Sequence, residues 1–233
     1  MQRIGITERG DAALDWADWW PWVSEGQPAI LISKNPQMLA ERLDTSKIQT
    51  PNVIVHATIT GYGGTPLEPN VPSVTSALEG FAELNKLLGK DRVVLRIDPV
   101  IPTVEGTKIA VEILQRAGKD NRVRVSFIDM YSHVRERLSI AGIDLHLTWN
   151  LFHAPLGLRF EAWNKLGRPE VCGEPGFKCT GCVSGSDCKI LGVEPIEFKS
   201  GQRPDCTCLA MKAELLHRKA PCSHACCYCY WRG

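Results

Sequence analysis

Residues 53–98 decide the fold, and they read VIVHATITGYGGTPLEPNVPSVTSALEGFAELNKLLGKDRVVLRID. Two short runs rich in β-branched residues, 53–58 and 92–98, flank a longer stretch with a helical pattern at 74–88. Strand, helix and strand in this order form a βα unit, which joins neighbouring parallel strands. Both short runs are nearly continuous in apolar residues, as expected when both faces of a sheet are covered. The sequence therefore predicts an α/β fold with a parallel sheet.

The same alternation of strand and helix patterns covers the first 171 residues. We expect about six parallel strands, arranged as a partial, TIM-like (βα) barrel. The further strands are predicted at residues 3–7, 29–33, 122–128 and 143–148, and the further helices at residues 11–20, 37–43, 105–117 and 132–141.

Composition and charge set the class of protein. The chain has 233 residues, of which 44% are hydrophobic, so it is long enough to bury one substantial core. Its net charge of +1 gives the whole molecule no strong field toward nucleic acid or an anionic membrane, although the end beyond residue 199 is mildly basic. No apolar run approaches the roughly 18 residues that a membrane span needs, and no signal peptide is apparent. We therefore expect a cytoplasmic protein with no membrane partner.

The cysteines are confined to the end of the chain. A reduced, cytosolic environment favours metal ligation over disulfides. We expect a boundary near Val171, between a partial barrel at residues 1–171 and a cysteine-rich segment at residues 172–233 that needs metal to be ordered. A short helix is predicted in this segment at residues 209–219. All ten cysteines lie there: Cys172, Cys179, Cys182, Cys188, Cys206, Cys208, Cys222, Cys226, Cys227 and Cys229.

Polar side chains gather at the predicted carboxyl ends of the strands, the rim where barrel-like sheets bind ligands. Arg96 and Asp98 share one face of their strand, so we expect an ion pair pointing into the barrel mouth. Lys34 follows the strand at 29–33 and could neutralise a carboxylate or phosphate. These three residues are the candidate catalytic residues. The alternative is that they are polar only because loops begin there.

The last cysteines form a tight group, since residues 222–230 read CSHACCYCY. Cys222, Cys226 and Cys229 have the spacing Cys-x3-Cys-x2-Cys, which can supply three thiolates to a [4Fe–4S] cluster. The fourth iron is then open to S-adenosylmethionine (SAM), whose reductive cleavage gives a 5′-deoxyadenosyl radical that abstracts a substrate hydrogen. Zinc is the alternative and would need a fourth cysteine, Cys206 or Cys208.

Four of the remaining cysteines could ligate an auxiliary [4Fe–4S] cluster. Cys206, Cys208 and Cys172 are candidates for three ligands, with Cys182 or Cys188 as the fourth. A structural zinc ion is the alternative for this group.

The cysteine motif at residues 222–230 resembles the Cys-x-His-x-Cys-x-Tyr-Cys-Tyr signature of spore photoproduct lyase-like radical SAM proteins. Residues 32–35, 58–60, 68–69 and 100–102 are similar to further elements of that group. In its ordinary members the cluster loop follows the first strand, whereas here it comes last. The segment from Ile4 to Asp11 resembles the second strand and its Thr-x-Asp loop, so the chain resembles a circularly permuted radical SAM core.

A family of uncharacterised domains with a C-terminal cysteine cluster is similar over most of the chain. The shared motifs are Thr-Ile-Thr-Gly-Tyr at residues 58–62, Arg-x-Asp-Pro at 96–99 and Ser-Phe-x-Asp-x-Tyr at 126–131. The chain departs from that pattern at residues 8–11, which read Glu-Arg-Gly-Asp in place of Arg-Arg-Thr-Asp, and in the additional Cys179.

The resemblance implies roles for the rim residues and the ligands. SAM, an electron donor such as flavodoxin or ferredoxin, and a nucleobase of DNA, such as a modified thymine, are the implied partners. Peptides, tRNA and small metabolites stay open as substrates, as does a non-catalytic zinc- or iron-sulfur-binding interaction module. The implied SAM contacts are Thr7 and Asp11 near the amino group, Thr58 and Thr60 near the ribose, Glu68, Arg96 and Asp98 near the carboxylate or substrate, and Ser126 and Tyr228 elsewhere.

Overall fold

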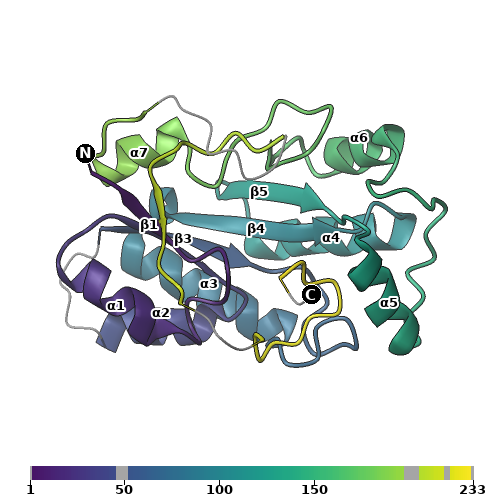
Figure 1. The fold of residues 1–233 in the computed structure, drawn as a ribbon, viewed down its shortest axis with the longest axis horizontal. Helices are drawn as coiled ribbons and strands as arrows, with labels where there is room; N and C mark the ends of the chain where they lie inside the picture. The colour runs from purple at the N-terminus through teal and green to yellow at the C-terminus, as the bar shows by residue number, and fades with distance from the viewer. Residues whose placement is uncertain (1, 46–51, 197–204, 218–220, 232–233) are drawn as a thin grey trace.

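The computed structural model describes residues 2–45, 52–196, 205–217 and 221–231 (Figure 1). Within these ranges the chain forms one parallel sheet of seven strands, curled into a half-barrel, with seven α-helices and one 3-10 helix. The strands lie in the order β6-β5-β4-β3-β2-β1-β7 across the sheet. The predicted α/β class and partial barrel are confirmed in this coarse form, with seven strands in place of six.

The strands are β1 (Ile4–Ile6), β2 (Ala29–Ser33), β3 (Val53–Thr58), β4 (Val93–Val100), β5 (Arg122–Phe127), β6 (Glu170–Val171) and β7 (Lys212–Glu214). The helices are α1 (Trp16–Ser24), α2 (Pro36–Thr45), α3 (Val74–Leu88), α4 (Val104–Ala117), α5 (Ser132–Ile140), α6 (Leu156–Lys165) and α7 (Gly185–Leu191), with the 3-10 helix η1 at Lys90–Arg92. None of the described helices combines the length and apolar character needed to cross a bilayer.

Alternate residues of the strands face a layer of helices. Leu31, Val55 and Leu95 belong to the main core, together with helix residues such as Phe81 of α3 and Ile113 of α4. All five side chains are almost fully buried. Burying a side chain of this size contributes about 1.5–3 kcal/mol, so this layer holds the helices on the outer face of the curled sheet.

The inner face of the sheet changes character along the strands. Toward their amino ends Ile30, Ile54 and Val94 pack against the cysteine-rich segment in a second apolar cluster. Toward their carboxyl ends the same face carries Thr58 and Arg96, which line a cavity. The cysteine-rich segment therefore closes one end of the half-barrel and leaves the carboxyl ends of the strands for a site.

The strand predicted at residues 143–148 is wrong, because this stretch forms no strand in the structure. Its alternating pattern instead places Ile143, Leu145 and Leu147 against the apolar cluster around α5. His146 has a positive φ of 51°, which interrupts an extended run. On the side of β5 away from β4, the neighbouring strand is the unpredicted two-residue β6.

The helix predicted at residues 209–219 is also wrong, and residues 218 and 219 lie outside the described residues. The chain here forms β7, which pairs in parallel with β1 through the register Ile4↔Lys212 and Ile6↔Glu214. Pairing with the exposed edge of β1 outweighs the local helical preference of this stretch. The barrel and the cysteine-rich segment consequently share one sheet.

The remaining differences are smaller. The helix predicted from Asp11 begins at Trp16, because residues 11–15 form turns in which Asp11 contacts the site. Helices α6 and α7 lie in stretches for which no helix was predicted. The bounds predicted for β2, β3 and α3 match those in the structure.

Candidate functional site

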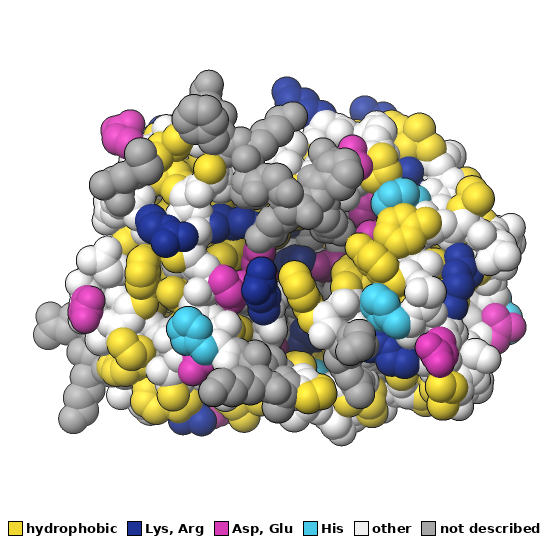
Figure 2. Space-filling model, in the orientation of Figure 1, with side chains coloured by type: hydrophobic (Ala, Val, Ile, Leu, Met, Phe, Trp, Pro, Cys, Tyr) yellow, Lys and Arg dark blue, Asp and Glu magenta, His cyan; other side chains and the backbone are white. Residues whose placement is uncertain are grey.

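A cavity of about 610 Å³ lies at the carboxyl ends of β1 to β4. Figure 1 shows the C-terminal loop beside these strand ends, and Figure 2 shows the same face hollowed near its centre, with acidic and basic side chains at the edge. The strands and the loop therefore enclose one space. Its walls include Asp11, Lys34, Thr58, Arg96 and Asp98 from the strand ends, and Cys222, His224, Cys226, Tyr228 and Cys229 from the loop.

The three cysteines of the predicted cluster motif line this cavity together. The backbone turns at each step between them, since Ala225 N donates to Cys222 O at 3.1 Å and Cys229 N donates to Cys226 O at 3.2 Å. Burial raises the pKa of the Cys226 thiol to about 12, and the nearby charge of Lys34 opposes that shift. A thiolate at Cys226 therefore needs further positive charge, which a bound metal centre would supply.

The loop is joined to residues 65–70 by hydrogen bonds. Cys227 N donates to Leu67 O at 2.9 Å, and the Asn70 side chain donates to Ser223 O at 2.7 Å. The Cys227 thiol donates to Pro66 O at 3.2 Å and is not among the residues lining the cavity. The Cys227 thiol is therefore directed at Pro66 and not at the cavity that the three predicted ligands line.

Asp11 is the main anchor of the loop. Its buried carboxylate accepts hydrogen bonds from Ser33 Oγ at 2.7 Å and from Lys34 N at 2.6 Å, and it contacts His224 Nε2 at 2.9 Å. Burial acts to raise the pKa of Asp11, but His224 and these donors outweigh it and hold the pKa below its ordinary value. Burial acts to lower the pKa of His224, and Asp11 raises it above the usual range. The pair is therefore a charged clamp between the first strand and the cysteine loop.

His224 was not among the residues singled out from the sequence. Its signal was present, because it is the histidine of the Cys-x-His-x-Cys motif. The structure gives that histidine and Asp11 a positioning role, while the predicted contact of Asp11 with the amino group of SAM stays a prediction.

Glu68 is the centre of a second buried network. Its carboxylate pairs with Lys34 Nζ at 2.8 Å and accepts from Thr60 Oγ1 at 2.7 Å, and it contacts the Tyr228 hydroxyl. Lys34 Nζ also lies 2.8 Å from the Tyr228 hydroxyl. Burial acts to lower the pKa of Lys34, but Glu68 together with the nearby Cys226 and Asp98 outweighs burial and raises the pKa. Lys34 is thus a protonated group that ties β2 to the loop.

Arg96 and Asp98 form the predicted ion pair at the cavity wall. Both side chains are largely buried, and Ser126 Oγ donates a hydrogen bond to Asp98. Burial acts to lower the pKa of Arg96, but Asp98 together with Cys182, Cys172 and Glu8 outweighs burial and raises the pKa above the ordinary value. The pair supplies a fixed dipole at the cavity rather than a free charge.

Thr58 has an unsatisfied hydroxyl at the cavity. Its side chain is 2% exposed, and among the described residues Oγ1 has no hydrogen-bond partner. An unpaired buried hydroxyl is costly, so a ligand that bonds to it is favoured. Thr7 differs, because its Oγ1 accepts from Ile32 N at 2.7 Å. The predicted cofactor residues Thr7, Thr60, Glu68 and Ser126 are not among the cavity-lining residues.

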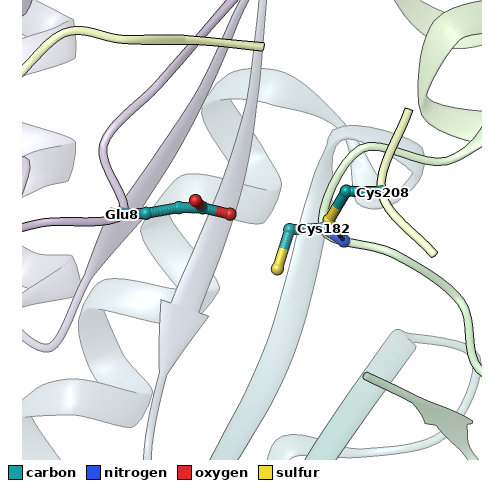
Figure 3. A group of neighbouring side chains, drawn as sticks. All are labelled: Glu8, Cys182 and Cys208. Atoms are coloured by element: carbon teal, nitrogen blue, oxygen red, sulfur yellow. Dashed lines mark hydrogen bonds between the residues drawn. The ribbon is translucent and has the colours of Figure 1, made fainter. Parts of the chain in front are cut away.

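The other predicted ligands form a second cysteine group, here Cys172, Cys182, Cys206 and Cys208. Cys172 Sγ and Cys182 Sγ lie 3.5 Å apart, and Cys182 N donates to Cys208 Sγ at 3.1 Å. Figure 3 shows the Glu8 carboxylate pointing toward Cys182 and Cys208. The ligand atoms of these three residues all lie within 4.8 Å of one another. The Cys188 thiol instead contacts Met211 Sδ at 3.8 Å.

A model for a family of domains of unknown function, DUF1848, matches residues 25–231. The chain belongs to the DUF1848 family. This match covers both cysteine groups and every strand except β1. A search of curated proteins found no match. Because the DUF1848 description states no activity, the chemistry has to be argued from the site.

The two cysteine groups of this DUF1848 domain differ in compactness. In the described part of the chain, three potential ligand atoms lie within 4.8 Å of one another only at Glu8, Cys182 and Cys208. The sulfurs of Cys222, Cys226 and Cys229 are therefore more widely spaced. Thiolates that bind different irons of one cluster lie farther apart than thiolates that share a single ion. Cys172, whose Sγ lies 3.5 Å from Cys182 Sγ, is likewise not a member of the compact group of Glu8, Cys182 and Cys208.

Proposed function

We propose that this chain is a radical SAM enzyme, in which Cys222, Cys226 and Cys229 hold a [4Fe–4S] cluster and SAM occupies the adjoining cavity. The observation that carries the proposal is that all three cysteines line the same cavity as the strand ends. When bound, the reduced cluster supplies the electron that splits the sulfonium of SAM into methionine and a 5′-deoxyadenosyl radical, which abstracts a substrate hydrogen.

The sheet topology supports the proposal. β7 leads into the cysteine loop and lies beside β1. Counted from β7, the strands follow one another across the sheet as β7, β1, β2, β3, β4, β5 and β6. The radical SAM proteins that this chain resembles have the cluster loop after the first strand of such a series. A circular permutation with its break after that loop gives the observed order.

The chain's own residues hold the loop in place over the cavity. The Asp11–His224 pair fixes one part of the loop, and the Glu68–Lys34–Tyr228 network fixes another. Glu68 and His224 are 1% and 3% exposed, so water competes little with these contacts. The positive charge of Lys34 acts to lower the pKa of Cys226, which favours the thiolate that a cluster requires.

The cavity provides room and polar contacts for SAM. Its volume of about 610 Å³ lies within the range of about 300–1,000 Å³ typical of ligand pockets. Thr58 offers an unpaired hydroxyl, and the Arg96–Asp98 pair offers both hydrogen-bond donors and acceptors. We assign Thr58 to a polar group of SAM, and Arg96 and Asp98 to SAM or the substrate.

For the substrate we propose a nucleobase, with flavodoxin or ferredoxin as the electron donor. The resemblance to spore photoproduct lyase-like proteins is the main support. Trp231 also lines the cavity and is 60% exposed, and the Arg9 guanidinium lies 5.4 Å from its ring centre. A flat aromatic face with an adjacent cation suits stacking with a base.

The test is electron paramagnetic resonance of the anaerobically reconstituted and reduced protein, with and without SAM. We expect a [4Fe–4S] signal that changes when SAM is added, because SAM binds the open iron directly. The Cys226→Ala variant should lose this signal, and Cys227→Ala, whose thiol points to Pro66, should retain it. A colourless protein with zinc at the triplet, or a cluster signal that SAM leaves unchanged, would contradict the proposal.

A further inference from the structure

The second cysteine group is assembled from three segments that are distant in sequence. Cys172 directly follows β6, Cys182 precedes α7, and Cys208 precedes β7. All three side chains are buried, with exposures of 5%, 6% and 1%. They belong to the apolar cluster that closes the inner face of the half-barrel. Cys172 and Cys182 also line the cavity described above.

Three members of the group lie close enough to share a single metal ion, and Cys172 adjoins one of them. Glu8, Cys182 and Cys208 place their ligand atoms within 4.8 Å of one another, and Cys172 Sγ lies 3.5 Å from Cys182 Sγ. Zinc binds thiolates at about 2.3 Å in a tetrahedron, which puts neighbouring sulfurs roughly 4 Å apart. Among the alternatives left by the sequence for this group, the compact arrangement favours a single ion over an iron-sulfur cluster.

Backbone contacts keep the cysteine segments close together. A Cβ atom on Gly181 would lie 2.5 Å from both N and Cα of Cys208, so only glycine permits this approach. Cys182 N donates to Cys208 Sγ at 3.1 Å, a contact of the kind that orients metal-bound thiolates. Cys172 N donates to Val125 O at 2.9 Å, which fixes Cys172 to the sheet.

Cationic side chains lie close enough to offset the negative charge of thiolates. Lys212 Nζ lies 2.9 Å from both carboxylate oxygens of Glu8, and its side chain is only 6% exposed. The Arg96 charge acts on both Cys172 and Cys182. Three thiolates and one carboxylate around a divalent ion carry excess negative charge, which Lys212 and, to a smaller degree, the Asp98-paired Arg96 offset.

We propose that Cys172, Cys182, Cys208 and Glu8 form a second metal site that binds one soft divalent cation such as Zn²⁺. The ion joins β1, β6 and β7 to the loop before α7 and so stabilises the closed end of the half-barrel. This site does not depend on the radical SAM proposal. Glu8 was not predicted as a ligand, because it is distant in sequence from every cysteine.

Two other cysteines supply matched controls. The Cys179 thiol exchanges hydrogen bonds with the backbone of Glu174, accepting from N at 3.1 Å and donating to O at 3.2 Å. The Cys188 thiol contacts Met211. Replacing either with serine removes a thiol from the same segment without touching the proposed ligands.

The test measures metal content in a chain without the C-terminal triplet. The Cys222→Ala/Cys226→Ala/Cys229→Ala variant is purified, and its zinc, iron and sulfide are quantified by elemental and chemical analysis. We expect about one zinc per chain, which Cys188→Ser or Cys179→Ser leaves in place and Cys182→Ser removes. Glu8→Gln is a milder change that keeps the side-chain volume, and it should weaken zinc binding at least tenfold in a competition with a chromophoric chelator.

Four outcomes would overturn the site. The triplet variant could fold and contain no metal, or it could contain iron and sulfide in place of zinc. The freshly purified protein could contain a disulfide between Cys172 and Cys182. Finally, Glu8→Gln could leave zinc binding unchanged. This variant lacks the triplet and should lose SAM cleavage whether or not it binds zinc. Its zinc content therefore tests the second metal site independently of the radical SAM proposal.

Discussion

Asp11 and His224 lie 213 positions apart in the sequence, and the Asp11 carboxylate contacts His224 Nε2 at 2.9 Å. This contact joins the loop after the first strand to the C-terminal cysteine loop. Both side chains are nearly fully buried. The place of the three cysteines over the cavity is therefore set by strand-end side chains as well as by the spacing within the motif.

Replacing Asp11 with asparagine should loosen the cysteine loop. The imidazole would lose its charged partner while remaining buried, which costs about 1–3 kcal/mol. We expect faster amide hydrogen exchange in residues 221–231, measured by mass spectrometry. Asp144→Asn is the control, because its side chain is 75% exposed and pairs only with an exposed histidine. Unchanged exchange in Asp11→Asn would show that the contact does not hold the loop.

The Lys34–Glu68 pair should be strongly coupled. Glu68→Gln leaves a buried ammonium without its counter-charge, and we expect a loss of about 3–5 kcal/mol in the free energy of unfolding. In a double-mutant cycle measured by denaturant unfolding, Glu68→Gln combined with Lys34→Met should lose less free energy of unfolding than the sum of the two single variants. The same cycle on Lys86 and Glu83, whose side chains are 71% and 58% exposed, should show coupling below about 1 kcal/mol. Additive effects at Lys34 and Glu68 would rule out the coupling.

Thr58→Val should weaken SAM binding and leave the fold intact. Valine has the shape of threonine but lacks the hydroxyl, which has no partner among the described residues. We expect a loss in SAM affinity of about 3- to 10-fold in equilibrium dialysis, with an unchanged or higher melting temperature. In Thr60→Val the hydroxyl bonded to Glu68 is lost, so that variant should be less stable. Equal SAM affinity in Thr58→Val and the wild type would exclude the hydroxyl from the SAM site.

His56 should make the protein less stable in acid. Burial, together with the charge of Arg124, lowers the pKa of His56 to about 3, below its ordinary value of 6.5. The unfolded chain therefore takes up a proton below pH 6.5 that the folded chain refuses, so this contribution to stability is lost as the pH falls from 6.5 toward 3. The free energy of unfolding should therefore fall between about pH 6.5 and 4.5. In His56→Gln this fall should be about 2 kcal/mol smaller than in the wild type. Changing the exposed His146 should leave the acid-induced fall in the free energy of unfolding unchanged. If His56→Gln also leaves this fall unchanged, His56 is not its cause.

Features that depend on local sequence were predicted well. The bounds of β2 and β3 follow from nearly continuous apolar runs, and α3 follows from its helical pattern. The Arg96–Asp98 pair was predictable because residues two apart in a strand share a face. The spacing also singled out the cysteine triplet, and the structure places all three residues at one cavity, while their role as cluster ligands stays a prediction.

Features that depend on long-range contacts were missed. β7 is a three-residue Lys-Ala-Glu strand that exists because β1 offers an open edge, and no local pattern marks it. The approach of Glu8 to Cys182 and Cys208 joins residues more than 170 positions apart, so spacing could not reveal it. Residues 143–148 led to the opposite error, because a strand was predicted there and none forms. Their apolar side chains pack against the cluster around α5, and this packing produces the same alternation as a strand.

The most direct test of the central proposal is the formation of 5′-deoxyadenosine from SAM by the anaerobically reconstituted protein under a strong reductant, quantified by liquid chromatography and mass spectrometry. We predict that the wild type and Cys227→Ala form this product and that Cys226→Ala, with the second metal site still loaded, forms none. A wild-type protein that carries a [4Fe–4S] cluster and leaves SAM intact, or a Cys226→Ala variant that still cleaves it, would contradict the proposal.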